Sequence, residues 1–578
     1  MRRFLIGFFA VVGVLSLLMV IGTGGLIYWA ATNFRVEPEE LPDEMILTLD
    51  LRGGVEENGP PDPFDYLGFD RGLSVTQIVR TLDQAREDPR VLGLIAQIDG
   101  GRQGFAVTQE LRQAVRRFAD SGRPTLAFAD SFGELSPGNV GYYLATAFDE
   151  IHMQPVGLVG LTGLSFEMPF ARETLEKIGV RFEVERRAEY KTALEFLTED
   201  APTPANAEMM RALLDDLQGQ MVSDIAERRE LTAGGFETIL SAGPFSAEEA
   251  RDRGLIDSLG YRDDARDAIS ALANGSDDWL TLATYAAESD LGDDDGPVVA
   301  SITASGPIIR GESEFGREIG ADTAARAIRE AVDDPEVEAI LMRVDSPGGS
   351  AVASETIGHE VERAVANGKP VVISMGDAAA SGGYWISMKA SHIVAEPATL
   401  TGSIGVVAGK PILGELWQKL GVNWSTIAQS DHATMWSVNQ DYSPSEAARV
   451  EALVDVMYDD FKQGVSEGRQ LDVEEVDRLA RGRVWTGQQA LDLGLVDELG
   501  GIFEAEAAVR RLAGLSPDEP LQLRSFPEPE NPFDRVLAIV QGEFGRLGMH
   551  GMIAAFWHTL LSEAGSLPTA WTDLPKVR

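Results

Sequence analysis

The chain contains one module written twice, and this duplication constrains its fold more than any other feature. "VLGLIAQIDGGRQGFAV" from Val91 aligns with "VEAILMRVDSPGGSAVA" from Val337, an offset of 246 residues. "VGYYLATAFDEIHMQPVGLVGLTG" from Val140 aligns with "GGYWISMKASHIVAEPATLTGSIG" from Gly382 at an offset of 242. "FSAEEARDRGLIDSLG" from Phe245 then aligns with "WTGQQALDLGLVDELG" at an offset of 240. We therefore expect two copies of the same fold in tandem.

Length and composition are compatible with this arrangement. The chain has 578 residues, and two units of about 200 to 250 residues plus flanking segments fit usual domain sizes. A formal net charge of −43 argues against nucleic-acid binding, which needs a basic surface. We interpret the acidity as a hydrated surface, with selection of basic ligands as the alternative. The absence of cysteine excludes disulfides, thiol catalysis and cysteine metal sites, and we expect no metal and no cofactor.

The amino terminus carries a long uncharged segment. Phe4 to Ala31 spans 28 residues without a charge and follows Arg2 and Arg3. About 20 apolar residues suffice to cross a bilayer, whereas the apolar part of a cleaved signal peptide has only about 7 to 15. We therefore predict a retained transmembrane helix rather than a buried core helix. The flanking charges predict a cytoplasmic amino terminus and a body on the other side of the membrane.

The order of elements in each copy indicates an α/β fold. Apolar runs such as "VLGLIAQID" and "VEAILMRVD" are typical of strands buried on both faces, and amphipathic segments such as "TAARAIREAVDDP" separate them. We divide the chain into an anchor (1–40), an N-terminal repeat (41–290), a C-terminal repeat (291–515) and a tail (516–578). The acidic, non-periodic stretch 286–297 marks the linker. The tail can pack on the body, on another subunit or on the membrane surface.

Two motifs of the C-terminal repeat indicate acyl-transfer chemistry. In "AAASGGYW", Ser381 follows a predicted strand and precedes a predicted helix, where its hydroxyl is exposed and amides of the helix start face developing negative charge. The loop "DSPGGS", from Asp345 to Ser350, ends the preceding strand, and its glycines let backbone amides approach a carbonyl closely. A nucleophile and oxyanion donors are the two requirements of such a site.

The N-terminal repeat has lost both motifs. Asn139 aligns with Ser381, and the dipeptide Arg102-Gln103 replaces Gly348-Gly349. The duplication therefore predicts one reactive serine rather than two.

A serine nucleophile needs a base. His392, in "ASHIVAEP", lies eleven residues after Ser381 at the start of a predicted strand, and no motif surrounds the other histidines. We favour a structural role for all six, which are His152, His359, His392, His432, His550 and His558.

Lysine can replace histidine when burial keeps it neutral. Lys389 lies eight residues after Ser381 on the same predicted helix, about 12 Å along its axis, and is badly placed. Lys191 in "AEYKTALEF" aligns with Ala433 of the other copy, so the N-terminal repeat alone keeps this amine. On residue type alone, a solvated lysine paired with Glu195 or Glu199 remains the alternative.

Five strings together resemble the signal peptide peptidase A family in its long, duplicated, membrane-anchored form. They are "AEYKTALEFLTED", "DSPGGS", "MGDAAASGGYWIS", "ATLTGSIGV" and "GLVDELGG", and the likeness covers about residues 1–515 in order. The resemblance implies two tandem ClpP/crotonase-like modules and a serine protease with a Ser/Lys dyad. It implies Ser381 as nucleophile, Lys191 as general base and Ser403 as an accessory hydroxyl that orients the lysine. The oxyanion donors it implies are the amides of Gly382 and of Gly348 or Gly349.

The same resemblance implies partners and a location. It implies a homotetramer that forms a bowl-like chamber, and cleavage of apolar peptides such as released signal peptides. The implied location is the bacterial inner membrane, with the catalytic body on the periplasmic side. Three alternatives remain open: a catalytically dead membrane-anchored scaffold, a crotonase-type acyl-CoA enzyme, and a ClpP-like protease that uses His392 as its base.

Overall fold

The computed structural model describes residues 41–57, 72–289, 296–313 and 318–527. The predicted transmembrane helix, the centre of the predicted linker and most of the predicted tail lie outside these residues. Among the described residues, no helix is long and apolar enough to cross a membrane.

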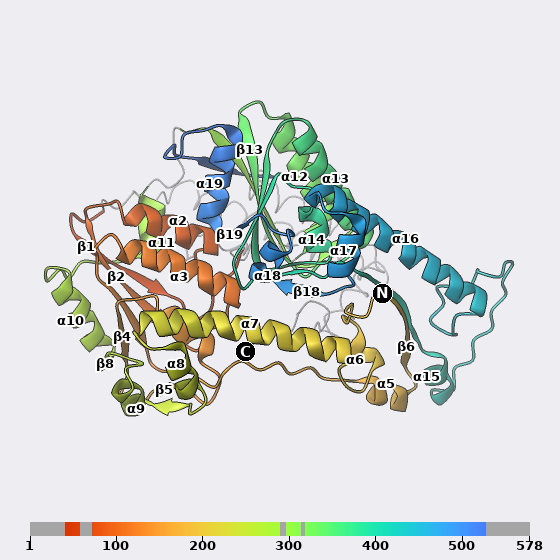
Figure 1. Ribbon diagram of the computed structural model, residues 1–578, viewed down its shortest axis with the longest axis horizontal. Helices are drawn as coiled ribbons and strands as arrows, with labels where there is room; N and C mark the ends of the chain where they lie inside the picture. The colour runs from red at the N-terminus through yellow and green to blue at the C-terminus, as the bar shows by residue number, and fades with distance from the viewer. Residues whose placement is uncertain (1–40, 58–71, 290–295, 314–317, 528–578) are drawn as a thin grey trace, which may run out of the picture.

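The N-terminal repeat is built on a parallel sheet of six strands in the order β8-β4-β3-β2-β1-β9 (Figure 1). Its strands are β1 (Met45–Asp50), β2 (Val91–Ile98), β3 (Thr125–Ala129), β4 (Glu150–Met153), β8 (Ser258–Leu259) and β9 (Trp279–Thr281), with a separate short pair β5 (Leu158–Val159) and β7 (Phe245–Ser246). Its main helices are α2 (Val75–Ala85), α3 (Phe105–Ala119), α4 (Asn139–Ala145), α7 (Pro204–Arg228), α8 (Ala233–Leu240), α9 (Ala247–Asp252), α10 (Arg262–Leu272) and α11 (Leu282–Glu288).

The C-terminal repeat has the equivalent six strands in the order β19-β15-β14-β13-β10-β20, and two more strands extend its sheet: β16 pairs with β14, and β18 pairs antiparallel with β16. Its strands are β10 (Val298–Ser305), β13 (Val337–Ser346), β14 (Val371–Ala380), β15 (His392–Ala395), β19 (Glu498–Leu499) and β20 (Gln522–Ser525), with β11 (Ile308–Ile309), β12 (Ile319–Gly320), β16 (Leu400–Gly402), β17 (Val406–Ile412) and β18 (Val484–Thr486). Its helices are α12 (Ala321–Asp333), α13 (Ala351–Ala366), α14 (Gly382–Ser387), α15 (Gly414–Lys419), α16 (Pro444–Arg469), α17 (Val473–Leu479), α18 (Gly487–Asp492) and α19 (Ile502–Ala513).

The two sheets confirm the prediction of duplicated α/β modules. β2 and β13 begin 246 residues apart, as do β3 and β14, whereas β4 and β15 begin 242 apart and β8 and β19 begin 240 apart. These are the offsets of the sequence alignment. One detail differs from the predicted division, because β20, from the segment assigned to the tail, pairs in parallel with β10 at the edge of the C-terminal sheet.

One hydrophobic core runs through both repeats. It joins Leu111 of α3 in the N-terminal repeat with Leu341 of β13 and Val372 of β14 in the C-terminal repeat, and with Ala505 of α19. Both α3 and α19 present amphipathic faces to this layer. The repeats therefore share a core instead of folding as two separate globules.

Buried charges lie in the same interface. Arg343 of β13 donates to Glu57 at 2.6 Å and to Glu110 of α3 at 2.6 Å, both from the N-terminal repeat. Asp377, on β14, accepts hydrogen bonds from the amides of Gly104 and Val107, each at 3.0 Å. The residue before helix α3 is Gly104, which has no side chain to cap the helix, so Asp377 of the other repeat supplies the cap.

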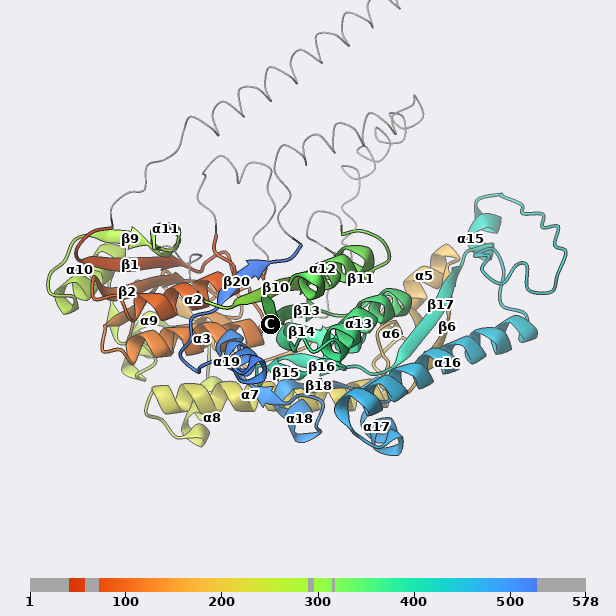
Figure 2. The same cartoon turned by 90° about the horizontal axis from the view of Figure 1, so that it is seen from above.

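An arm of the N-terminal repeat reaches across the C-terminal repeat. It consists of α5 (Arg172–Ile178), β6 (Arg181–Arg187) and α6 (Glu195–Thr198), and β6 pairs antiparallel with β17. Figures 1 and 2 show the arm near α15, at the opposite end of the molecule from the N-terminal sheet. Helix α7 then returns the chain to its own repeat beneath both sheets (Figure 1). Lys191 lies in the arm, between β6 and α6.

Candidate active site

Ser381 lies at the tight turn between β14 and α14, as the sequence predicted. It is the residue directly before α14, and its backbone has φ 55° and ψ −114°. A positive φ is uncommon for a residue with a side chain and is maintained only where the surroundings enforce it. Here the Ser381 amide donates to the carbonyl of Gly402, in β16, at 2.9 Å. Ser381 therefore lies in the turn itself, between the strand and the helix. Backbone strain of this kind is common at functional sites.

Three predicted side chains meet at this turn. The Nζ of Lys191 lies 2.8 Å from the Oγ of Ser381, 3.0 Å from the Oγ of Ser403 and 2.9 Å from the carbonyl oxygen of Ser403. Ser381 and Ser403 belong to the C-terminal repeat, whereas Lys191 comes from the N-terminal arm. Neither repeat can assemble this cluster alone.

Lys191 is buried, with 5% of its surface exposed. Burial lowers the pKa of its ammonium to about 7, because a charged amine is costly to remove from water. The alternative pairing with Glu195 is wrong, because Glu195 pairs with Arg186 at 2.8 Å and accepts a hydrogen bond from Asn206. Glu199 is not among the hydrogen-bond partners of Lys191 either. Near neutral pH, a substantial fraction of this lysine is therefore uncharged.

The glycine loop lies directly against the serine turn. Gly348 has φ +102°, and a methyl group added there would come within 2.6 Å of the Gly382 nitrogen and 2.9 Å of the Ser381 Cβ. A methyl group on Gly382 would lie 3.0 Å from the Gly349 nitrogen. Only glycine permits this approach of the two backbones. The amides of Gly382 and Gly349 consequently lie close together beside the hydroxyl.

The two loop amides differ in their hydrogen bonds. The Gly348 amide donates to the Oγ of Ser346 at 3.2 Å. Within the described residues, no hydrogen bond of the protein uses the amide of Gly349 or of Gly382. Gly349 rather than Gly348 therefore has a free N–H beside Ser381.

The corresponding turn of the N-terminal repeat is used structurally. Asn139 is buried at the start of α4, where its amide group donates to the carbonyl of Gly163 at 3.0 Å and accepts from the amide of Thr162 at 3.1 Å. These bonds fix the loop that precedes the arm. The position equivalent to Ser381 therefore has a structural role in the N-terminal repeat.

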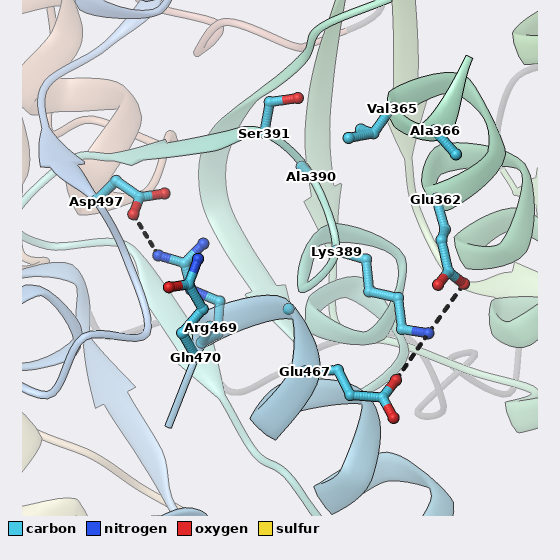
Figure 3. A pocket seen from close by; sticks show the side chains of 11 residues that line it. Glu362, Val365, Ala366, Lys389, Ala390, Ser391, Glu467, Arg469, Gln470 and Asp497 are labelled. Carbon is cyan, nitrogen blue, oxygen red and sulfur yellow. Dashed lines mark hydrogen bonds and ion pairs between the residues drawn. The ribbon is translucent and has the colours of Figure 1, made fainter. Parts of the chain in front are cut away.

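The other candidate bases lie elsewhere. His392 is at the start of β15, as predicted, and its Nε2 lies 2.9 Å from a carboxylate oxygen of Glu498. Lys389 borders a separate cavity of about 460 Å³ (Figure 3), where its Nζ contacts Glu362 at 2.9 Å and Glu467 at 3.5 Å. Neither contacts Ser381, so the structure agrees with the poor placement expected for Lys389.

A loop that the sequence analysis did not single out also borders the cluster. Residues 480–483 connect α17 to β18, and the carbonyl of Arg481 accepts from the amide of Tyr190 at 3.1 Å. The amide of Ser403 donates to the carbonyl of Arg483 at 2.7 Å. The sequence signal for this loop was a glycine between two arginines, in "ARGRVWTG", at the start of the third repeated block.

Comparison with known proteins gives one consistent family. Residues 117–276 and 363–516 match Peptidase family S49, one segment in each repeat. The chain is 34% identical over 479 residues to "Protease 4" of Haemophilus influenzae, covering 78% of this chain and 75% of that protein. It is 30% identical over 504 residues to "Serine protease SPPA, chloroplastic" of Arabidopsis thaliana, covering 85% and 73%. "Protease 4" of Salmonella typhi is 34% identical over 454 residues, covering 76% and 72%.

Among solved structures, a ClpP1 mutant of Listeria monocytogenes covers 34% of this chain and 90% of its own, at 14% identity and a TM-score of 0.22. The family membership rests on the sequence matches. Those matches span both repeats, and with them the predicted relationship to signal peptide peptidase A is confirmed. The chain belongs to Peptidase family S49 and is a serine protease.

Proposed function

We propose that this protease uses Ser381 as its nucleophile and Lys191 as its general base. The observation that carries the proposal is the contact between the two side chains, 2.8 Å across the repeats, with the pKa of Lys191 lowered to about 7 by burial. General bases act best when their pKa lies near the working pH and when they are within hydrogen-bond reach. Both conditions hold for Lys191.

The surroundings of the amine support a role for Ser403. A neutral amine has two N–H donors and one lone pair. The two oxygens of Ser403, at 2.9 and 3.0 Å, accept the two donors, which leaves the lone pair for the hydroxyl proton of Ser381. Ser403 therefore orients the base.

The reaction then proceeds in two halves. Lys191 takes the proton of Ser381 as its oxygen attacks the peptide carbonyl, and the amides of Gly382 and Gly349 stabilise the oxyanion. The C–N bond breaks, the protonated lysine gives its proton to the leaving amine, and an acyl-enzyme remains. Water then gives a proton to the same lysine and attacks the ester; the bond between the acyl carbon and the Ser381 Oγ breaks, the lysine returns the proton to that oxygen, and the acid is released. No metal or cofactor takes part in any of these steps.

We further infer the substrates and the location. The substrates are apolar peptides, including signal peptides already released from their proteins, and the segment from Phe4 to Ala31 holds the enzyme in the bacterial inner membrane. The catalytic body then lies on the periplasmic side. An anchored enzyme meets such peptides where they are produced, which is the physical reason for combining an anchor with this site. A ClpP/crotonase-like origin of the two modules belongs to the same proposal.

The test of this function uses the full chain in detergent. The enzyme is incubated with a fluorogenic apolar peptide, with an acyl-CoA thioester and with a fluorophosphonate whose attachment site is mapped by mass spectrometry. We expect peptide cleavage and a single labelled residue, Ser381. Thioester turnover that survives in Ser381→Ala would favour the acyl-CoA enzyme, and tight peptide binding without cleavage would favour the scaffold.

Peptidase activity is expected to rise with pH through a midpoint near 7. Below that pH, Lys191 is protonated and cannot accept the proton of Ser381; above it, the amine is neutral. The measurement is kcat/KM from pH 5.5 to 9. His392→Ala should keep the same midpoint, because His392 contacts Glu498 and not Ser381. A profile that falls with pH, or one that His392→Ala abolishes, would contradict the lysine base.

The duplication also supports self-association into a homotetramer. Strand β6 of the N-terminal arm pairs with β17 of the C-terminal repeat. At the offset of 242, the counterpart of β6 is segment 423–429, which is exposed throughout and includes Trp424 and Ile427. The counterpart of β17 is segment 164–170, which alternates half-buried and exposed residues and has no strand partner in the described chain. We propose that these two segments pair between copies, head to tail, in a closed ring, for which the family resemblance implies four chains.

Replacing both Trp424 and Ile427 by aspartate is expected to convert the tetramer to smaller species. The two side chains are 60% and 96% exposed, so the substitutions do not disturb the core of a single chain. Sedimentation equilibrium of the full chain in detergent measures the result. Val156→Asp is the control, since Val156 is 80% exposed and lies outside both segments. An unchanged mass in the double variant would contradict this interface.

A further inference from the structure

The loop of residues 480–483 contacts the elements that hold both sides of the Lys191 cluster. On one side, the Arg481 carbonyl accepts hydrogen bonds from the amides of Ala188 and Tyr190, at 3.4 and 3.1 Å. On the other, the Gly482 amide donates to the carbonyl of Ile404 at 2.8 Å, and the Arg483 carbonyl accepts from Ser403 at 2.7 Å. The loop therefore links the lysine-bearing arm of one repeat to the Ser403 turn of the other.

Gly482 is the point of closest approach. A methyl group added there would lie 2.6 Å from both the Cα and the Cβ of Lys191, which is closer than side-chain carbons approach in proteins. Gly482 also has φ +79°, but Gly368 has φ +84° with nothing within 4 Å of an added methyl group. Gly482 therefore differs from Gly368 in its close packing against Lys191 and not in its backbone conformation.

The side chain that follows Gly482 holds the residue before the lysine. The Arg483 guanidinium lies 4.8 Å from the centre of the Tyr190 ring and 4.6 Å from that of Trp485. It also pairs with Glu208 at 2.8 Å, and Glu208 accepts a hydrogen bond from the hydroxyl of Tyr190. Stacking of a guanidinium on two rings, together with a hydrogen bond to a carboxylate, fixes orientation more than it adds stability.

We propose that Gly482 is a positioning residue for the catalytic lysine: its lack of a side chain sets how deeply Lys191 enters the space between Ser381 and Ser403. The proposal rests on the proposed function, because it assigns Gly482 a role only through Lys191. A shift of the Lys191 backbone by about 1 Å would lengthen the contact between Nζ and Ser381 beyond hydrogen-bond reach, and misplacements of this size cost about 100-fold in rate. It would also let water reach the amine.

The test compares Gly482→Ala with Gly368→Ala in the full-length enzyme. For Gly482→Ala we expect kcat to fall about 10- to 100-fold with KM little changed, and the midpoint of the pH profile to move above 7, because a better hydrated lysine has a higher pKa. Gly368→Ala carries the same backbone strain without the close contact and should keep the kcat and the midpoint of the wild type. A merely structural role for Gly482 would not move the midpoint.

Arg483→Met provides a second readout if Gly482→Ala fails to fold. Its side chain lies partly at the surface, so the variant should fold, with a kcat about 3- to 10-fold lower and a midpoint moved in the same direction. A wild-type midpoint in both variants overturns the proposal. Failure of the dyad itself gives a different result, because Lys191→Met would then stay active, whereas a wrong role for Gly482 leaves Lys191→Met inactive.

Discussion

Replacing Lys191 by methionine is expected to lower kcat/KM for an apolar peptide by about 10³- to 10⁴-fold. Methionine has a similar length and no basic nitrogen, so the hydroxyl of Ser381 loses the partner 2.8 Å away that takes its proton. Ser381→Ala should cost at least as much. The double variant should be no less active than the less active single variant. Removing either member of one catalytic unit already removes the contribution of the whole unit.

Stability separates loss of chemistry from loss of fold. Lys191 has a pKa of about 7 in the folded chain and about 10.5 when unfolded, so between these values the unfolded chain binds a proton that the folded chain does not. Wild-type stability therefore falls as the pH drops from about 10 to 7. Lys191→Met removes this cost, and its melting temperature should equal or exceed that of the wild type, with the difference growing toward pH 7. A folded Lys191→Met enzyme with full activity would contradict the dyad and reopen the question of a histidine base.

The module and its serine were predictable because their signals are local. Ser381 lies in a strand-turn-helix motif, and the glycine loop of Gly348 and Gly349 ends the neighbouring strand, so both follow from the order of elements. The choice between these two glycines was not predictable. It depends on the Ser346 hydroxyl, which occupies one of the two amides in the folded structure.

Lys191 required the family resemblance, because its position depends on long-range pairing. The arm that carries it leaves its own repeat and pairs β6 with β17, more than 200 residues later in the sequence. No periodicity within "AEYKTALEF" indicates that destination. The alignment showed only that the N-terminal repeat keeps a lysine where the other has Ala433. Gly482 was missed for the same reason, since its role depends on which backbone lies against it.

The buried charges of the interface were also missed, although the sequence contained a signal. Arg343 interrupts the apolar strand "VEAILMRVD", and Glu110 lies within the helical segment that follows β2. A charged residue in a buried strand needs a partner. The sequence could not show that the partners, Glu110 and Glu57, come from the other repeat.

Replacing Arg343 by methionine is expected to lower the free energy of unfolding by about 3 to 5 kcal/mol. Arg343 is only 4% exposed and contacts Glu57, Glu110 and Ser374, so the substitution leaves two buried carboxylates without a cation. Urea denaturation of the full chain measures the loss. Arg251→Met is the control, because Arg251 pairs with Asp252 at the surface and such pairs contribute about 1 kcal/mol or less.

The loss should be larger at pH 8 than at pH 6. Burial already raises the pKa of Glu110 despite the opposing charge of Arg343, and burial with the charge of Asp377 raises the pKa of Asp345 to about 7. Without Arg343 the pKa values of both carboxyls rise further. The folded chain then keeps protons that the unfolded chain releases, so the free energy of unfolding falls as the pH increases. An equal loss at both pH values would indicate a packing defect alone. Glu110 joins β13 to helix α3 through Arg343, and Asp377 joins β14 to the same helix. The same variant should therefore lose peptidase activity as the pH rises, because the repeats that supply Ser381 and Lys191 then lose their shared interface.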